Sequence, residues 1–440
     1  MYLHQELLAR AGEGRPVRVG LIGAGKFGSM FLSQVPSTPG LEVAVIADLD
    51  PDAARTACRN VGWPEELIAG TRFTDDAMAM IRAADVDVVV EATGNPAAGL
   101  VHASEAIRAG LHVIMVNVEA DVLAGPLIAE EAMRAGVVYS FAYGDQPALT
   151  CELVEWARAC GFEVVAAGKG TKYLPAYHAC TPDEVWDHYG LTPEQAIEAG
   201  MNSRMFNSFL DGTKSALEMA AIANATGLTP PPDGLRFPPA GMDDLAQVLR
   251  PASEGGQLHH KGQVEVVSSL QRDGQPVPRD LRWGVYVVVE APNDYVAQCF
   301  RQYAMNTDTS GRYSAMYKPF HMIGLELNIS ILSAALLNKP TGMTRGFRGD
   351  VVASAKRDLK AGEVLDGEGG HTVWGKLYPA ETSLEIGGLP IGLAHGVKLK
   401  TDIAANAPVR WRDVEVDETQ AAVKIRRAME TAFRPARAAE

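Results

Sequence analysis

The chain has 440 residues, of which 47% are apolar and 21% are charged, as in ordinary globular proteins of two or three domains. Asp and Glu number 54 against 40 for Lys and Arg, so the formal net charge is −14. This balance argues against a nucleic-acid-binding protein, which normally carries a basic excess. Any anionic ligand would need a local cluster of cations.

Cysteine usage and the apolar segments predict the compartment. The five cysteines are scattered without a CxxC pair, which favours a reducing compartment over a disulfide framework or a zinc site. Residues 1–20 carry charges where a signal peptide needs an apolar core, and the longest apolar stretch, 323–337, is interrupted by Glu326 and Asn328. We therefore expect a cytoplasmic protein.

The stretch VRVGLIGAGKFGSMF, residues 17–31, predicts a buried strand, a glycine turn and a helix. In the pattern GxGxxG the glycines permit a tight turn, let a pyrophosphate approach the backbone, and let helix and strand pack closely. A second strand, 41–48, ends at Asp48, where a dinucleotide fold has an acceptor for the ribose hydroxyls. A generic strand-to-helix turn is the weaker alternative, because the strand, the helix and the acid all fit a dinucleotide site.

The alternation of strands and helices continues along the first third of the chain. Strands are expected at 86–94, 112–121 and 137–148, with helices at 98–110 and 127–136. This predicts an α/β doubly wound parallel sheet, a Rossmann fold, with its ligand at the carboxyl ends of the strands. The predicted cofactor-binding residues are Gly23, Gly25, Lys26, Phe27, Gly28, Asp48, Thr93, Gly94, Asn117 and Glu119.

The sequence leaves the choice of nicotinamide cofactor open. Asp48 would repel a 2′-phosphate, which favours NAD. Arg55 and Arg59 on the following helix could offset that repulsion and accept NADP.

Polar residues are dense in the segment 201–220, which follows the nucleotide half. Asn207, Asp211, Lys214 and Glu218 are spaced by four, three and four residues, so on a single helix they would share one face. A solvated surface is one interpretation of such a stripe. Large apolar side chains flank it, however, which favours a face that lines a cleft.

Hydride transfer to or from a carbon–oxygen bond needs a group that gives or takes a proton at the oxygen. A partly desolvated lysine beside a carboxylate can do this, and Lys214 with Asp211 or Glu218 is such a pair. Lys169 and Lys172 could also transfer this proton, or they could bind a phosphate or carboxylate group. The predicted catalytic residues are Lys169, Lys172, Asp211, Lys214 and Glu218.

The β-rich segments 263–270 and 282–291 predict an α+β substrate domain with an antiparallel sheet, a common place for contacts in a homodimer or higher homo-oligomer. The predicted residues for binding a small anionic substrate are Asn202, Arg204, Asn207, Arg312, Tyr317, Lys318 and His321. No HExxH motif or His/Cys cluster stands out, so metal ligands are not assigned, although distant Asp and Glu residues could assemble a magnesium site.

The last quarter of the chain changes character. Residues 350–379 and 390–414 combine short strands with glycine pairs, and an amphipathic helix is expected at 417–433. This predicts a small β-rich module that supports the fold or acts as a lid. The three expected domains are the nucleotide-binding, substrate and β-rich domains, over residues 1–150, 151–345 and 346–440.

The motifs GLIGAGKFG, EATGNP and VNVEAD resemble the nucleotide domain of homoserine dehydrogenases, and KRDLKAGEVLDGEGG resembles a SAF domain. This layout is similar to that of the DXR-like (DRL) family of oxidoreductases. The resemblance implies conversion of 1-deoxy-D-xylulose 5-phosphate to 2-C-methyl-D-erythritol 4-phosphate with NADPH, in isoprenoid biosynthesis, and a divalent Mg or Mn ion. It makes five residues candidates for the phosphate, namely Lys169, Lys172, Arg204, Arg312 and Lys318.

The chain departs from homoserine dehydrogenases in two places. Their catalytic helix carries Asp followed by Lys, which Asp211 and Lys214 match with a spacing that differs by one. Their Asn-Lys after the fourth strand is Asn117-Val118 here, so homoserine is a poor substrate candidate. The alternatives are a dehydrogenase of a small hydroxy acid, sugar acid or sugar phosphate, and a non-catalytic sensor, against which the polar stripe argues.

Overall fold

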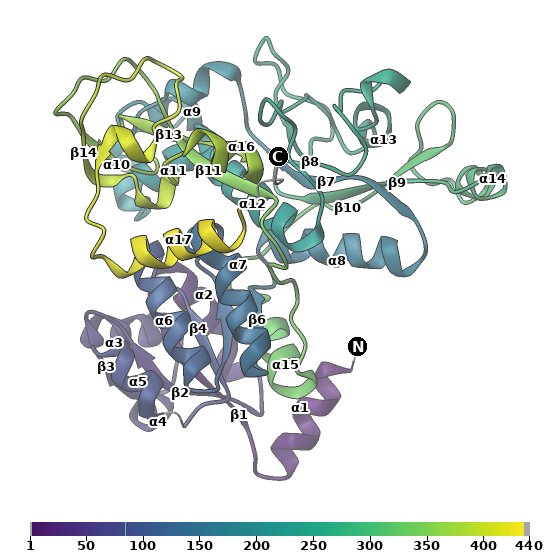
Figure 1. Cartoon of the computed structure of the whole chain (residues 1–440). Helices are drawn as coiled ribbons and strands as arrows, with labels where there is room; N and C mark the ends of the chain where they lie inside the picture. Colours follow the sequence, from purple (N-terminus) through teal and green to yellow (C-terminus); the bar gives the residue numbers. More distant parts are fainter. Residues whose placement is uncertain (1, 84, 435–440) are drawn as a thin grey trace. The chain divides into compact units, whose positions relative to one another are not determined.

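The structure is a computed structural model that describes residues 2–83 and 85–434 (Figure 1). The chain folds into two compact units. The first comprises Met1–Cys151, His321–Arg345 and Lys424–Met429, and the second comprises Glu152–Phe320, Gly346–Val423 and Glu430–Glu440. Within the described ranges, no helix has the length and apolar character that crossing a bilayer requires.

Six parallel strands form the sheet of the first unit. They are β1 (Val17–Ile22), β2 (Leu41–Ala47), β3 (Arg72–Thr74), β4 (Val88–Glu91), β5 (His112–Met115) and β6 (Tyr139–Phe141). Their order in the sheet is β3-β2-β1-β4-β5-β6, and all neighbours run parallel. The order reverses between β1 and β4, which is where a doubly wound sheet binds its ligand. The expected Rossmann sheet is confirmed.

Helices cover both faces of this sheet. The core on one face joins apolar residues of the strands to those of α1 (Leu3–Gly12), α2 (Lys26–Gln34) and α15 (Asn328–Leu337). In Figure 1, α1 and α15 lie side by side although they come from distant parts of the chain. Helices α5 (Ala77–Ala83) and α6 (Pro96–Arg108) cover the other face.

Helix α15 explains why residues 321–345 belong to the first unit, although we expected them in the substrate domain. The helix is apolar over most of its length and buries Ile331 and Leu332 against the sheet. This burial removes apolar surface from water, which ties the segment to the Rossmann core.

The expected strand at 112–121 is wrong in its second half. Strand β5 ends at Met115, and α7 (Val118–Ala135) begins after Asn117, whose side-chain oxygen accepts a hydrogen bond of 3.1 Å from the Ala120 N–H. This is an N-cap, the contact that starts a helix. The expected strand at 137–148 is likewise shorter, because α8 (Gln146–Ala159) begins within it.

Asp121, in the first turn of α7, is a fully buried carboxylate. The hydroxyls of Tyr139 and Thr344 each donate a hydrogen bond of 2.9 Å to it. Burial raises its pKa from 3.8 to about 6, and these hydrogen bonds offset only part of the rise. The folded protein therefore holds a proton on Asp121 more tightly than the unfolded chain does.

Asp121→Asn should raise the free energy of unfolding at pH 8 by on the order of 2 kcal/mol. Because the folded pKa is the higher one, stability falls as the pH rises from about 4 through about 6, and the amide should abolish this part of the fall. The amide oxygen still accepts from both hydroxyls. Thermal unfolding between pH 4 and 8 measures the effect, and a variant with the wild-type pH dependence would contradict it.

The second unit contains a four-stranded mixed sheet. Its strands are β7 (Glu163–Thr171), β8 (Gln263–Ser268), β9 (Val285–Glu290) and β10 (Tyr313–Lys318), in the order β10-β9-β7-β8. Strands β7, β9 and β10 pair antiparallel. Of the two segments expected in an antiparallel sheet, β9 fits this arrangement, whereas β8 does not pair with β9 and runs parallel to β7. The shorter helices of this part of the chain are α9 (Val185–Tyr189), α10 (Pro193–Glu198), α13 (Leu245–Val248) and α14 (Asp294–Gln302).

The last part of the second unit is β-rich, as expected. Strands β11 (Gly349–Ala355) and β13 (Val373–Pro379) form one antiparallel pair, and β12 (Val364–Asp366), β14 (His395–Leu399) and β15 (Val414–Glu415) form a small sheet. Helices α16 (Ala380–Ile386) and α17 (Ala421–Ala432) follow β13 and β15.

Helix α12 (Thr213–Thr226) is the central helix of the second unit. It packs against β11 and β13 on one side and against β7 and β8 on the other. Small residues make this close packing possible: Gly349 lies against the Ala220 backbone, and Gly375 lies against the Thr213 side chain. The helix is therefore buried on nearly all sides, and the polar residues that it carries lie in a low-dielectric environment.

Candidate functional site

The glycine turn between β1 and α2 has the geometry of a phosphate cradle. Gly23 has a φ of 94°, and a Cβ there would lie 2.7 Å from the Ala92 carbonyl oxygen. A Cβ on Gly28 would overlap the Gly23 carbonyl oxygen, so helix and turn can approach only without it. Gly25 caps α2 without any side-chain hydrogen bond, and a Cβ there would meet nothing within 4 Å. Open space in front of a helix N-terminus fits a pyrophosphate.

Gly25→Ala should therefore weaken the binding of a nicotinamide dinucleotide by at least ~10-fold while leaving the melting temperature unchanged, since the methyl group would occupy only the place of the phosphates. Gly28→Ala is the matched comparison, because its methyl group meets the Gly23 backbone and should lower stability as well. Calorimetric titration with NADH and NADPH measures the first effect. Undiminished affinity in Gly25→Ala would place the dinucleotide elsewhere.

Asp48 lies beside the cradle, directly after β2. Its carboxylate accepts hydrogen bonds from the backbone N–H of Ala24, at 2.8 Å, and of Asp50, at 3.1 Å. These bonds hold the carboxylate next to the glycine turn, as an acceptor for ribose hydroxyls requires. Arg55 and Arg59, the two candidates for a 2′-phosphate, are each 2.7 Å from a carboxylate oxygen, on Asp52 and Glu65 respectively.

The other predicted cofactor residues lie at the same sheet edge or on α2. Lys26 is exposed and Phe27 is half-buried at the start of α2, and Thr93 and Gly94 are exposed after β4. Asn117 is buried and serves the fold, because it caps α7 and donates to the Asn95 carbonyl at 2.9 Å. Glu119 is half-buried in the first turn of α7.

A buried ion pair joins α12 to the sheet of the second unit. Lys169, on β7, donates to Glu218, on α12, and the two side chains are 8% and 4% exposed. Both residues are predicted from the sequence as catalytic, but not as a pair, because they are 49 positions apart. Removing either charge would leave the other buried without compensation, which is costly.

The predicted single helix face over residues 207–218 is wrong. Helix α11 (Ser203–Leu210) ends at Asp211, Gly212 has a φ of 91°, and α12 starts at Thr213. Asn207 and Asp211 therefore belong to the first helix and its end, and Lys214 and Glu218 to the second. The glycine is the signal that could have predicted the break, since it readily adopts a positive φ.

Asp211 pairs with Lys356, a residue that was not predicted from the sequence. Lys356 Nζ lies 2.8 Å from Asp211 Oδ2 and donates to the carbonyl oxygens of Cys180, at 2.6 Å, and Gly370, at 2.7 Å. The Asp211 side chain is fully buried and that of Lys356 is 2% exposed. The available signal was a lysine that directly follows the apolar run of β11.

His178 and Tyr173 form a second polar contact at the end of α11. His178 Nδ1 lies 2.7 Å from the Asp211 carbonyl oxygen, which only accepts, so Nδ1 carries the proton. Nε2 then accepts from the Tyr173 hydroxyl at 2.9 Å. Burial lowers the pKa of His178, and the ring of Trp374 stacks on it at 3.8 Å between centroids. His178 is thus held as a neutral ring.

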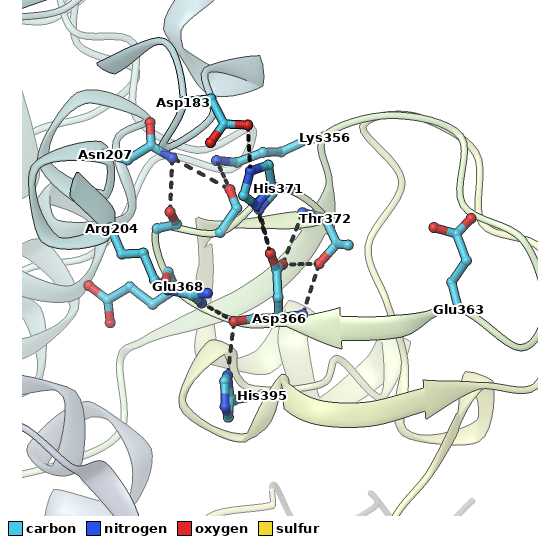
Figure 2. A network of polar contacts seen from close by, with 12 residues as sticks. Asp183, Arg204, Asn207, Lys356, Glu363, Asp366, Glu368, His371, Thr372 and His395 are labelled. Carbon is cyan, nitrogen blue, oxygen red and sulfur yellow. Dashed lines mark hydrogen bonds and ion pairs between the residues drawn. The ribbon is translucent and has the colours of Figure 1, made fainter. Parts of the chain in front are cut away.

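Figure 2 shows the loop 366–372 of the β-rich part fastened to α11. Asn207 donates to the Gly369 carbonyl at 3.0 Å, and Arg204 donates to the Asp366 carbonyl. Burial acts to raise the pKa of Asp366, but hydrogen bonds from His371 and Thr372 outweigh it and lower the pKa to about 2. Arg204 and Asn207, predicted to bind substrate, hold this loop.

The remaining predicted residues do not form one group. Asn202 is exposed and caps α11, while Arg312 is exposed and pairs with Glu290 at 2.7 Å. Tyr317 and Lys318 are half-buried at the end of β10. Lys172 follows β7 in the second unit, whereas His321 belongs to the first unit.

Among the residues that the structure describes, no three His, Cys, Asp or Glu side chains are grouped closely enough to hold a metal ion. The structure therefore assigns no ligands to the divalent cation that the resemblance implies.

Three family models match successive parts of the chain. Residues 23–141 match the NAD-binding domain of homoserine dehydrogenase, residues 144–327 match the catalytic domain of oxidoreductase DRL, and residues 350–415 match the SAF domain. With the strand order and the glycine cradle, these matches define the chain as an NAD(P)-dependent oxidoreductase that binds a nicotinamide cofactor. More narrowly, it is an oxidoreductase with a homoserine-dehydrogenase-like front, a DRL-type catalytic part and a SAF domain.

Solved structures of dehydrogenases match parts of the chain. A homoserine dehydrogenase from Thiobacillus denitrificans is 17% identical, with 74% of each chain covered and a TM-score of 0.45. A myo-inositol dehydrogenase from Lactobacillus casei, in complex with NAD(H) and myo-inositol, is 17% identical over 39% of this chain and 50% of that chain, with a TM-score of 0.29. A 3-ketoreductase from Actinomadura kijaniata, in complex with NADP, is 18% identical over 37% of this chain and 48% of that chain, with a TM-score of 0.27.

The chain spans about half the length of the last two structures. No curated protein matches it.

Proposed function

We propose that this oxidoreductase catalyses the NADPH-dependent reductoisomerisation of 1-deoxy-D-xylulose 5-phosphate to 2-C-methyl-D-erythritol 4-phosphate. The observation that carries the proposal is the match of residues 144–327 to the DRL catalytic domain, a range that contains all five predicted catalytic residues. The NAD-binding and SAF matches on either side complete the domain order that the resemblance implies.

The reaction combines a carbon-skeleton rearrangement, which is redox-neutral, with one reduction. A bound nicotinamide would supply the hydride that adds to the carbonyl carbon of the rearranged substrate. One proton must then reach the alkoxide oxygen. We assign this proton to Lys214, because it is half-buried in the first turn of α12, whereas Lys169 is 6% exposed and held by Glu218. Lys169 and Glu218 then act by positioning α12 against β7.

The test is to incubate the full chain with 1-deoxy-D-xylulose 5-phosphate and NADPH, with and without manganese, and to follow the nicotinamide absorbance. We expect NADPH oxidation and a branched polyol phosphate, identified by NMR. Absence of oxidation, together with reduction of NAD⁺ on a hydroxy acid or sugar acid, would replace the proposal by the simple dehydrogenase.

That dehydrogenase is the second candidate, and the surroundings of Asp48 favour it. The Asp48 carboxylate, held beside the cradle, would repel a 2′-phosphate, and both nearby arginines are already paired with carboxylates. This arrangement favours NAD over NADP.

Asp48→Ser should shift kcat/KM towards NADPH relative to NADH by at least ~10-fold, because it removes the repulsive charge and keeps a hydroxyl. Asp75→Ser, which removes an exposed carboxylate after β3, is the control with the same change in net charge. If the ratio of the two cofactors is the same in Asp48→Ser and in the wild type, Asp48 does not contact the ribose.

A further inference from the structure

Two cations lie together at one end of the four-stranded sheet. Lys172 directly follows β7, and Arg282 precedes β9 by three positions. Because β7 and β9 pair antiparallel, with Lys169 opposite Val285, the end of β7 adjoins the beginning of β9. The Gly170 N–H donates to the Gly284 carbonyl at 3.1 Å, which fixes this approach.

Both side chains lie over the same aromatic ring. Lys172 Nζ is 5.4 Å and Arg282 Cζ is 5.7 Å from the ring centroid of Tyr189. Arg282 also lies 4.7 Å from the ring of Trp283. Cation–π contacts hold the two head groups in place, but they do not neutralise the charges.

In the described part of the chain, no carboxylate lies within 4.0 Å of either head group. Lys172 donates to the His188 carbonyl, and Asp280 accepts from the backbone N–H of Arg282, not from its guanidinium. Burial, and then the charge of Arg282, lower the pKa of Lys172. The two groups therefore repel each other without a counter-ion.

Several other buried or half-buried cations of the fold are paired with carboxylates. Arg250 lies 2.8 Å from Asp308, Lys356 lies 2.8 Å from Asp211, and Lys261 lies 2.6 Å from Glu290. In a chain with 54 acidic residues, two adjacent cations without a carboxylate are best explained by an anion that they bind.

We propose that Lys172 and Arg282 form the subsite that binds the phosphate group of the substrate. A guanidinium offers two parallel N–H donors to a phosphate, and an ammonium adds a point charge. The assignment rests on the proposed function for its substrate class, a small phosphorylated carbonyl compound. It adds Arg282 to the candidate residues and assigns Lys172 to binding instead of proton transfer.

The first test measures inorganic phosphate binding to the full chain by calorimetric titration in phosphate-free buffer, without turnover. We expect binding by the wild type and at least ~10-fold weaker binding by Arg282→Ala and by Lys172→Ala. Arg301→Ala removes an exposed arginine of α14 and should bind as the wild type does. Melting temperatures identify any variant that fails to fold, and Arg282→Lys, which keeps the charge, should bind with intermediate affinity. Equal binding by Arg282→Ala and the wild type, or none by the wild type, would overturn the proposal.

The second test separates the substrate's phosphate from a free anion. Under the proposal, Arg282→Ala raises KM for the phosphorylated substrate by at least ~10-fold with a smaller change in kcat, and inorganic phosphate competes with that substrate. If phosphate binding is lost in the variant but KM is unchanged, the site binds a free anion and the assignment to the substrate is wrong. Because the first test needs no turnover, an inactive protein in the reductoisomerase assay would refute the proposed function without deciding the subsite.

Discussion

Lys356→Met is expected to lower the free energy of unfolding by about 3–5 kcal/mol, the cost of leaving a buried charge without its partner. The ammonium of Lys356 is surrounded by Asp211 and by the carbonyl oxygens of Cys180 and Gly370. Methionine fills a similar volume but donates no hydrogen bond. The carboxylate of Asp211 would then be fully buried with only the Thr213 N–H as a donor, at 2.9 Å.

Urea unfolding followed by tryptophan fluorescence is a suitable measurement, because Trp374, one of the six tryptophans, stacks on His178 in the same unit. The double variant Lys356→Met/Asp211→Asn should recover much of the loss, because the uncompensated charge is gone. Lys360→Met is the matched control, since its ion pair with Asp402 is 72% and 59% exposed and should contribute less than about 1 kcal/mol. A loss in Lys356→Met no larger than in the control would contradict the buried pair.

The nucleotide-binding half could be predicted from the sequence because its signals are local. The glycine turn, the flanking β-branched strand and Asp48 lie within 32 consecutive residues, from 17 to 48, and each element follows from its own residues. The errors are at element ends. Residues 118–121 alternate between apolar and acidic side chains, as a half-buried strand does. They form a helix instead, because the side chain of Asn117 caps its first turn.

The polar contacts of the second unit could be predicted only in part. The sequence pointed to Lys169, Asp211 and Glu218 by residue type and density, but spacing along one helix gave the wrong partners. The actual partner of Asp211 is Lys356, which is 145 positions away and comes from the β-rich part. Such pairs depend on how α12 packs between two sheets, and no short-range pattern encodes that arrangement.

The two buried pairs also limit which residue can transfer a proton. Lys169 and Lys356 are less than 10% exposed, each beside one carboxylate, so both are held in place by the fold. Lys172 lies near the cationic Arg282, an environment that suits binding an anion. Lys214 is half-buried on the same helix as Glu218, so of the lysines on α12 and the two buried pairs it is the most exposed one.

Lys214→Ala should therefore lower kcat by at least ~100-fold, with KM for the substrate changed by less than about 3-fold, because a proton donor acts mainly in the transition state. The prediction applies to both candidate reactions, since carbonyl reduction needs a proton given to the oxygen of the reacting carbon and alcohol oxidation needs one taken from it. The melting temperature should stay within a few degrees, as Lys214 is not fully buried.

The rate is measured with whichever substrate the wild type turns over, at saturating cofactor. Lys360→Ala, an exposed lysine of the β-rich part, is the control for loss of one positive charge and should keep full activity. Lys214→Arg keeps the charge but holds its proton too tightly to give it up, so it should be nearly as slow as the alanine variant. Near-normal turnover in Lys214→Ala would reduce this lysine to a structural residue.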